Sequence, residues 1–256
     1  KGLSERGVIK NENTIVSSLV SKEQIQTAEI EELVEKKFAG SIPAFLTAFT
    51  KSQQLTADEI QEMQQMIDRF RKEHPDARVI SGGSDVLIKI REGKMAGTSL
   101  VSIRDIKEIK GIRQMESGDI YIGAGTTFSH VTNDPVIQKL IPVLGEAVDQ
   151  VGGPQVRNIG TIGGNVCNGA VSADSAPTLF SLNAMLRIAD GTGGRMVPIR
   201  DFYLGPGKVD LHQGDVLTHI VIPGKDYQGY HGFYIKYSMR NAMDIATLSC
   251  SVVSRI

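Results

Sequence analysis

The sequence predicts an α+β protein preceded by a small all-α segment. The first 73 residues contain 3 glycines and 22 charged side chains, whereas the remaining 183 residues contain 24 glycines and 35 charged side chains. In this second part, short strands, hairpin turns and helices alternate, which is typical of an α+β domain rather than a doubly wound sheet. We place the boundary near His74-Pro75, because a proline disfavours helical geometry in the residue before it. The two expected domains are therefore residues 1–73 and 74–256.

The first segment is expected to form three short amphipathic helices. Ser21–Gln24 and Thr56–Glu59 have the spacing of capping boxes, which begin helices. Apolar residues recur at helical spacing behind each box, and Gly40 and Pro43 end one helix and begin the next. Because three such helices bury only a thin core, units of this kind often need a partner surface. Self-association through residues 21–73 is the expectation that follows.

The second segment is expected to contain two hairpins, one helix between them and several further strands. Turn residues 116–118 and 191–194 each separate two strand-like stretches. Pro135 to Val151 has the apolar period of a single helix. The remaining expected strands are 77–80, 100–103, 216–222 and 234–238.

Two glycine-rich segments carry the predicted chemistry. Arg78 to Asp85 form a strand that runs into two glycines with a serine on either side. Glycine lets consecutive amides converge on an anion and lets the backbone approach a phosphate closely, although a plain turn is the alternative. Residues 152–169 hold 6 glycines and 3 asparagines, which is too glycine-rich for a helix and too apolar for a flexible linker. We expect backbone folded against a ligand there, with the carboxylate of Asp174 able to accept from a ribose hydroxyl.

Several other kinds of site are excluded. Neither G-x-G-x-x-G nor G-x-x-x-x-G-K-[ST] occurs, and Gly123–Phe128 only partly imitates the former. The five histidines have no metal-binding spacing, and two cysteines cannot supply a disulfide framework, a four-cysteine zinc site or an all-cysteine cluster. We interpret Cys167 as a small buried residue, and Asp244 beside Arg240 as an ion pair or cap.

The charge balance narrows the range of partners. With 28 basic and 29 acidic residues the formal net charge is −1, which argues against a general nucleic-acid binder. No apolar run approaches the roughly 20 residues of a membrane span. We therefore expect a cytoplasmic protein with no membrane contact.

Four stretches carry a family resemblance in order: "ARVISGGSDVLIKIREGK", "GGPQVRNIGTIGGNVCNGAVSADSAPTL", "FYLGPGKVDL" and "FYIKYSMRNAMDIATLSCSV". They resemble the FAD-binding subunit of molybdenum hydroxylases, above all the medium subunit of bacterial xanthine dehydrogenases. The similarity runs from about Phe70 to Ile256. It implies a two-lobed FAD-binding fold of the molybdenum-hydroxylase flavoprotein type, with the FAD diphosphate between the two glycine-rich loops.

The resemblance also implies a set of FAD-binding residues, without a catalytic side chain or a metal ligand. The first loop comprises Arg78, Val79, Ile80, Ser81, Gly82, Gly83, Ser84 and Asp85, and the second comprises Gly160, Thr161, Ile162, Gly163, Gly164 and Asn165. Asn168 and Asp174 fall in the ribose and ribityl region, and Leu217 and Lys236 fall near the isoalloxazine ring. A cation near the ring stabilises anionic reduced flavin, which suits Lys236; the alternative is a solvent-facing lysine on an edge strand.

A second resemblance covers residues 1–73. "KGLSERGVIKNEN" is similar to the last helix and wing of a winged helix in the penicillinase-repressor and copper-repressor family, and "LVSKEQ" follows it. "KKFAGSIPAFLTAFTKSQQLTADEIQEMQQMID" is similar to the dimerisation helices of that family. The expected recognition helix is absent, so no base-reading residue can be carried over, and a generic three-helix bundle is the alternative.

The sequence also departs from the flavoprotein pattern. The helix Thr56–Lys72 takes the place of the family's first helix, and the first strand is missing or replaced. We also expect the chain to be truncated before the family's small C-terminal domain.

The resemblance implies an FAD-dependent oxidoreductase subunit that is inactive without its partners. Partner subunits holding the molybdenum cofactor and 2Fe-2S clusters would oxidise a purine or related heterocycle, and FAD would pass the electrons to NAD or another acceptor. Two alternatives stay open. One is a regulatory or oligomerisation module with a non-functional flavin domain, and the other is a stand-alone FAD oxidoreductase.

Overall fold

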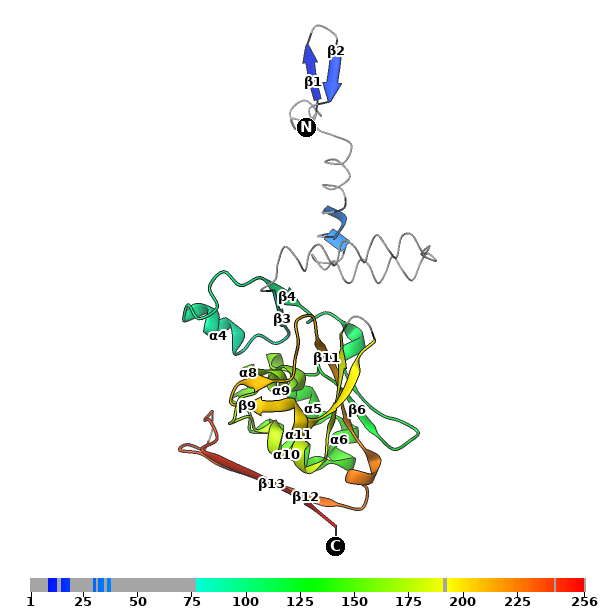
Figure 1. Cartoon of the computed structure of the whole chain (residues 1–256), viewed down its shortest axis with the longest axis vertical. Helices are drawn as coiled ribbons and strands as arrows, with labels where there is room; N and C mark the ends of the chain where they lie inside the picture. The colour runs from blue at the N-terminus through cyan, green and yellow to red at the C-terminus, as the bar shows by residue number, and fades with distance from the viewer. Residues whose placement is uncertain are drawn as a thin grey trace. The chain divides into compact units, whose positions relative to one another are not determined.

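The computed structural model describes residues 9–12, 15–18, 30, 32–34, 36–37, 77–190, 193–241 and 243–255 of the chain (Figure 1). The chain divides into two compact units, Lys1–Asp68 and Arg69–Ile256. The boundary expected from the sequence, near His74-Pro75, lies a few residues after this division.

In the first unit, two short strands form a hairpin. β1 (Ile9–Glu12) pairs antiparallel with β2 (Ile15–Ser18). Helical residues follow between Ile30 and Lys37. A hairpin here agrees with the resemblance to a wing, but it differs from the expectation that residues 1–73 are all-α. Both capping boxes and the second and third expected helices lie outside the described residues.

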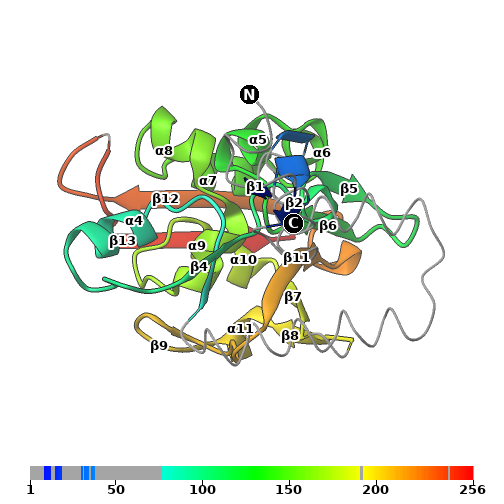
Figure 2. The same cartoon turned by 90° about the horizontal axis from the view of Figure 1, so that it is seen from above.

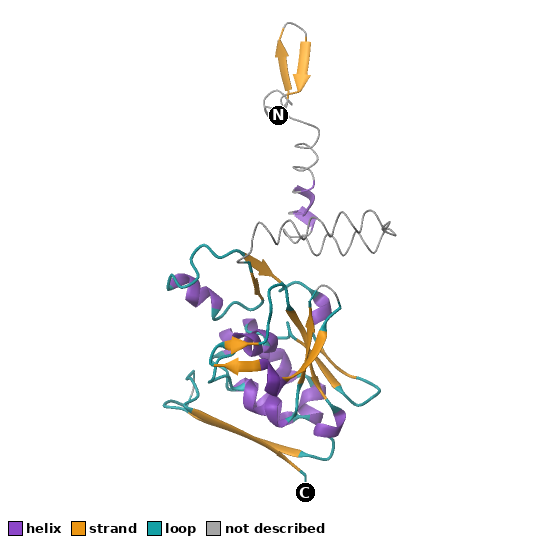
Figure 3. Cartoon of the chain, viewed as in Figure 1, coloured by secondary structure: helices purple, strands orange, loops and turns teal. Residues whose placement is uncertain are grey.

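The second unit is built around a five-stranded antiparallel sheet (Figure 3). The hairpins expected around turn residues 116–118 and 191–194 are both present, so these two predictions are confirmed. The long strand β11 joins them, because it pairs with β6 on one side and β7 on the other. The strands lie in the order β5 (Ile112–Gln114), β6 (Ile120–Gly123), β11 (Val216–Ile222), β7 (Met185–Ala189), β8 (Arg195–Pro198).

Helices bury one face of this sheet. Alternate strand residues such as Ile122, Ile188 and Ile220 are fully buried and belong to one continuous hydrophobic core with residues of the helices. This alternation is the pattern of a sheet with one face packed on a core. The helices that contribute to the core are α5 (Phe128–Asn133), α6 (Pro135–Leu140), α7 (Pro142–Asp149), α9 (Ile162–Asn168), α10 (Ser175–Ser181) and α11 (Ile199–Phe202).

The single helix predicted over Pro135–Val151 is wrong, because the structure breaks it into α6 and α7. Pro142 has no amide hydrogen and its ring clashes with the preceding turn of a helix. Ile141 accordingly leaves helical geometry, and Pro142 begins the next helix at its first turn.

A small parallel unit precedes the main sheet. β3 (Arg78–Ile80) pairs parallel with β4 (Leu100–Ser102), and the helix α4 (Val86–Arg91) lies between them in sequence. Past the strands, the amide of Ile103 still donates to the carbonyl of Ile80 at 2.9 Å. The carboxyl ends of both strands therefore meet at one edge, where ligands commonly bind in parallel sheets.

The last described strands form a long hairpin, β12 (His231–Tyr237) with β13 (Leu248–Ser254). β12 lies against α7 and β13 against α10 (Figure 2). Tyr234 is buried on the inner face with Val143 and Ala147. The outer face is apolar and exposed, and it consists of three directly paired rows: Phe233 with Val252, Ile235 with Cys250, and Tyr237 with Leu248.

The remaining short elements complete the second unit. They are α8 (Pro154–Ile159), β9 (Tyr203–Gly205), β10 (Lys208–Val209) and the 3₁₀ turns Lys107–Ile109 and Gly224–Asp226. Within the described ranges, no helix has the length and apolar character needed to cross a membrane.

Candidate functional site

The two predicted glycine-rich loops touch each other directly. A Cβ added to Gly82 would lie 2.3 Å from the carbonyl oxygen of Ile159 and 2.9 Å from the Cα of Gly160. Only glycine leaves room for backbone to pack on backbone at that distance. Beside this contact, the hydroxyl of Thr161 donates to the hydroxyl of Ser81 at 3.3 Å. The backbone of the first loop thus packs directly against the backbone of the second.

A second set of polar contacts links the helices that follow the two loops. The side-chain amide of Asn168 donates to Asp85 at 3.3 Å, and Lys89 donates to the Asn168 carbonyl oxygen at 3.0 Å. Asn168 ends α9, whereas Asp85 and Lys89 belong to the start and middle of the parallel unit's helix. The two lobes are therefore joined at two points.

The second loop is largely helical, so the expectation that residues 152–169 are too glycine-rich for a helix is wrong. Pro154 opens α8, and Thr161 caps α9 by accepting from the amide of Gly164 at 3.1 Å. A Cβ on Gly163 would lie 2.4 Å from the Cβ of Ala124, so glycine is required where the first turn of α9 lies against the end of β6. The glycines serve close packing between elements.

A third segment lies between the loops. The amide of Phe128 donates to the Gly160 carbonyl at 3.1 Å, and the amide of Ile162 donates to the Thr126 carbonyl at 3.0 Å. Thr127 caps α5 by accepting from the amide of His130 at 3.3 Å. The first turns of α5 and α9 therefore lie side by side.

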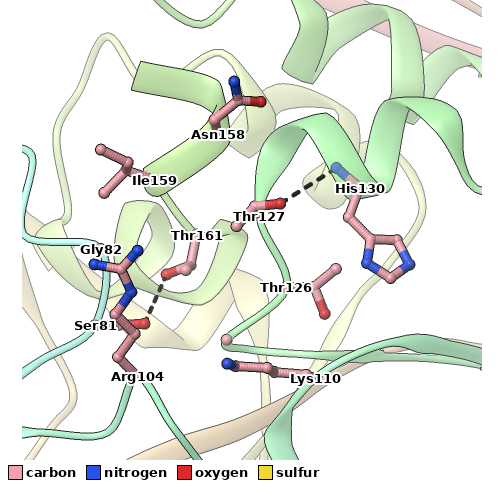
Figure 4. A pocket seen from close by; sticks show the side chains of 11 residues that line it. Ser81, Gly82, Arg104, Lys110, Thr126, Thr127, His130, Asn158, Ile159 and Thr161 are labelled. Carbon is pink, nitrogen blue, oxygen red and sulfur yellow. Dashed lines mark hydrogen bonds between the residues drawn. The ribbon is translucent and has the colours of Figure 1, made fainter. Parts of the chain in front are cut away.

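A cavity of about 190 Å³ opens where these three segments meet (Figure 4). Its lining contains four hydroxyls, three basic side chains and no carboxylate. Arg104 lies near Ser81 and Thr161, while His130 lies on the opposite side with Thr126, Thr127 and Lys110 between. The lining residues are Ser81, Gly82, Arg104, Lys110, Gly125, Thr126, Thr127, His130, Asn158, Ile159 and Thr161.

The charges around this cavity are unevenly compensated. The His130 ring nitrogen lies 3.3 Å from a carboxylate oxygen of Asp134. In the part of the chain that the structure describes, the side chains of Arg104 and Lys110 make no hydrogen bond or ion pair. A cavity with free cations and hydroxyl donors is chemically suited to an anion.

The predicted first-loop residues lie partly in the cavity lining and partly in the strand and helix on either side of it. Ser81 and Gly82 line the cavity; Arg78, Val79 and Ile80 form β3 before it; Gly83, Ser84 and Asp85 lead into the following helix. Of the second loop, Thr161 lines the cavity and Gly160 lies beneath the first loop, whereas Ile162, Gly163 and Gly164 form the first turn of α9. Asn165 accepts from Ser175 at 2.7 Å and so joins α9 to α10.

Asp174 and Lys236 lie together in a buried ion pair. Lys236 donates to one Asp174 oxygen at 2.9 Å and to the Gln150 carbonyl at 3.0 Å. The hydroxyl of Tyr234 donates to the other Asp174 oxygen at 2.8 Å. The Lys236 and Asp174 side chains are only 5% and 7% exposed. Burial, together with the hydrogen bond to Asp174, raises the pKa of Tyr234.

This arrangement excludes one of the two interpretations of Lys236. The lysine is not a solvent-facing residue of an edge strand, and its charge is compensated by Asp174. Both Asp174 oxygens already accept hydrogen bonds, which the sequence analysis did not foresee. Leu217 is 3% exposed in the core of the main sheet and does not line the cavity.

Sequence reasoning missed most of the basic and threonine lining. Gly125, Thr126 and Thr127 belong to the segment dismissed as an incomplete dinucleotide motif, and a threonine before an apolar helix was the available N-cap signal. Arg104 and Lys110 gave no signal, because both are placed by contacts between distant residues. The pairing of β3 with β4 places Arg104, and backbone hydrogen bonds to Gly125 and Thr126 place Lys110. Asn158 and Ile159 lie in the helix that was not expected.

Two interpretations of single residues made from the sequence can be compared with the structure. Cys167 is half-buried against the core, and desolvation raises the pKa of its thiol to about 12, so it is not a reactive thiolate. Asp244 accepts from the Arg240 amide at 2.8 Å and pairs with its guanidinium at 3.4 Å, as expected. Among the described residues, no group of three His, Cys, Asp or Glu side chains could hold a metal ion.

A parallel β-α-β unit packs on a helix-covered antiparallel sheet, and a cavity with basic and hydroxyl side chains lies at their contact, so the molecule is a two-lobed α+β domain with a site suited to an anionic ligand. The family described as FAD binding domain in molybdopterin dehydrogenase matches residues 50–225, and the chain belongs to this family. Residues 1–69 match the penicillinase repressor family, which agrees with the second resemblance.

Relatives and solved structures support the same family. The chain is 39% identical over 184 residues to a putative xanthine dehydrogenase FAD-binding subunit of Escherichia coli, covering 72% of this chain and 63% of that protein. It is 33% identical to the carbon monoxide dehydrogenase medium chain of Hydrogenophaga pseudoflava, covering 70% and 62%. The chain thus spans less than two thirds of these relatives.

Two solved structures have similar folds. Carbon monoxide dehydrogenase from Hydrogenophaga pseudoflava matches with a TM-score of 0.67 and 31% identity, covering 71% of this chain and 62% of that one. Quinoline 2-oxidoreductase from Pseudomonas putida 86 matches with a TM-score of 0.67 and 29% identity, covering 73% and 64%. The two-lobed α+β fold predicted from the sequence is confirmed.

The contact between the loops predicts that Gly82→Ala is destabilising. The new methyl group would overlap backbone atoms of Ile159 and Gly160, which cannot rotate away, so we expect a loss of about 1–3 kcal/mol in urea unfolding. Gly145→Ala is the control, because its Cβ would meet a side-chain methyl of Ile137 at an ordinary 3.4 Å. Equal unfolding midpoints for Gly82→Ala and wild type would contradict the seating of the loops.

The buried ion pair predicts a larger effect for Asp174→Ala. Removing the carboxylate leaves Lys236 buried without its partner, which costs about 3–5 kcal/mol. The matched control is Glu92→Ala, whose pair with Lys94 is exposed and contributes about 0–1 kcal/mol. Urea unfolding of both variants without flavin measures the difference; losses of similar size would show that the Asp174 pair is not effectively buried.

Proposed function

We propose that this chain is the flavoprotein subunit of a molybdenum hydroxylase of the xanthine dehydrogenase type. In this proposal, FAD binds with its diphosphate in the cavity between the loops. Electrons arrive from iron–sulfur and molybdenum-binding partner subunits and leave to NAD or another acceptor. The observation that carries the proposal is the cavity itself. It joins both glycine-rich loops, and its lining contains hydroxyls, two cations that have no partner among the described residues, and no carboxylate.

The donor set fits a dinucleotide. Ser81 and Thr161 are hydroxyl donors from the two loops, and Gly82 keeps the backbone there free of side chain. We assign these residues, with Arg78–Asp85 and Gly160–Asn165 around them, to the diphosphate. Asn168 is assigned to the ribose and ribityl region. When bound, FAD supplies a centre that exchanges electrons singly or in pairs, so it can link one-electron clusters to a two-electron acceptor.

Lys236 is assigned to the isoalloxazine end, together with the apolar side chain of Leu217, and its partner Asp174 is assigned to the adjoining ribose and ribityl region. Because the positive charge of Lys236 is balanced by the negative charge of Asp174, the pair presents a local dipole with little net charge to the ring. Tyr234 holds the second Asp174 oxygen and so fixes the direction of that dipole. No side chain acts as a nucleophile in this proposal.

The substrate belongs to the partner chains. The relatives carry names with different substrates, among them xanthine, nicotinate and carbon monoxide, so a shared flavin domain does not select one. We propose a purine or related heterocycle, since the xanthine dehydrogenase subunits are 39% identical to this chain.

We propose a cytoplasmic location because the described cysteines, Cys167 and Cys250, are both free thiols.

Two observations bear on the alternatives. The exposed apolar face of the β12–β13 hairpin is typical of surface that further polypeptide covers, either a partner subunit or the part of the relatives' length that this chain does not span. The match of residues 1–69 to the penicillinase repressor family favours self-association through residues 21–73 as an added property. We propose residues 1–73 and 74–256 as the corresponding domains.

Purification of the chain tests the proposed function. We expect a yellow protein, or a colourless one that takes up one FAD on titration, with no turnover of heterocycle or NADH unless partner subunits are added. A folded protein that binds no FAD would contradict the proposal. Turnover without partners would favour the stand-alone oxidoreductase.

Thr161→Ala is expected to weaken FAD binding. The variant loses the hydroxyl that faces the cavity and caps α9, and one charge-assisted hydrogen bond corresponds to about 10- to 150-fold in affinity. Thr161→Ser retains the hydroxyl and should bind within about threefold of wild type. Fluorescence titration measures both; wild-type affinity in a stably folded Thr161→Ala would remove Thr161 from the site.

A further inference from the structure

We propose that Arg104 and Lys110 bind the FAD diphosphate through their charges, an inference that rests on the proposed function. Neither residue lies in the glycine-rich loops, and nothing in the sequence pattern assigns them a role. Both line the cavity beside hydroxyl donors (Figure 4).

The position of Arg104 follows from the parallel unit. β3 and β4 run in register, with Ile80 opposite Ser102, and the Ile103 amide donates to the Ile80 carbonyl just beyond the strands. The chain past β3 becomes Ser81–Gly82, and the chain past β4 becomes Arg104. The Arg104 amide also donates to the Ser102 hydroxyl at 3.3 Å, which fixes the local turn. The guanidinium therefore enters the cavity from the edge at which the first loop also lies.

The backbone on either side of Lys110 is held just as firmly. The Gly125 amide donates to the Ile109 carbonyl at 2.8 Å, and the Gly111 amide donates to the Thr126 hydroxyl at 3.0 Å. Lys110 is thus fixed against the segment that precedes α5. Its flexible side chain is the part left free to meet a ligand.

The charge balance gives the ligand its chemistry. Within the described residues, neither cation has a hydrogen-bond or ion-pair partner, and the neighbouring acids Asp105 and Glu108 do not line the cavity. Two uncompensated positive charges match the two negative charges that a nucleotide diphosphate carries at neutral pH. His130, the third basic group, already faces Asp134 at 3.3 Å.

The test compares Arg104→Gln, Lys110→Gln and the double variant of the full chain with two controls, Arg113→Gln and Lys107→Gln. The controls are exposed cations outside the cavity lining. FAD, ADP and riboflavin are titrated at several NaCl concentrations. We expect each single cavity variant to lose about tenfold in FAD and ADP affinity at low salt, with riboflavin and the control variants unchanged. Salt should weaken FAD binding by wild type far more than by the double variant.

The outcomes separate the inference from the proposed function. If wild type binds FAD and the cavity variants bind it equally well with the same salt dependence, the inference is overturned while the proposed function stands. Equal losses of riboflavin affinity also overturn it, since the two residues would then act through the fold and not through the diphosphate. Equal losses in the control variants overturn it as well, since any surface cation would then have the same effect. Failure of wild type to bind FAD overturns both.

Discussion

The contact of Gly82 with the backbone of Ile159 and Gly160 is the constraint on which the site depends. It lets the parallel unit, which has few buried residues of its own, seat its loop on the helices of the main sheet. Gly163 makes a second close contact of this kind, where the first turn of α9 lies against Ala124. These contacts bring the hydroxyls of Ser81 and Thr161 together and leave a cavity between them and Thr127. A larger side chain at either glycine would separate the elements that form the cavity.

The ionic groups that we assign to the site fall into two different environments. Asp174 and Lys236 are buried and compensate each other, so this pair is complete without a ligand. Arg104 and Lys110 are exposed at the cavity and have no partner among the described residues, so their charge is available to a ligand. The site is therefore rigid at the buried pair and attractive to anions at the cavity. This division suits a cofactor with a charged diphosphate and an uncharged ring.

Local sequence signals accounted for the elements but only part of the site. Turn residues located both hairpins, and strand β11 coincides with its predicted residues. The apolar period over Pro135–Val151 was given more weight than Pro142, although a proline inside a helix is itself a signal for a break. Glycine content gave the wrong answer for α9, because Gly163 is needed for the close contact with Ala124. Ser81, Gly82 and Thr161 were found through the family resemblance. Arg104, Lys110 and the Asp174–Lys236 pair depend on contacts between distant residues, which no local pattern encodes.

Hydrogen–deuterium exchange with and without FAD tests most directly whether the meeting of the two loops forms the cofactor site. The central claim predicts that FAD slows exchange together at Ser81–Ser84, at Gly160–Gly164 and at the segment around Thr127, because one diphosphate contacts all three. A protected set that includes only one loop, or that is confined to the β12–β13 hairpin, would contradict it.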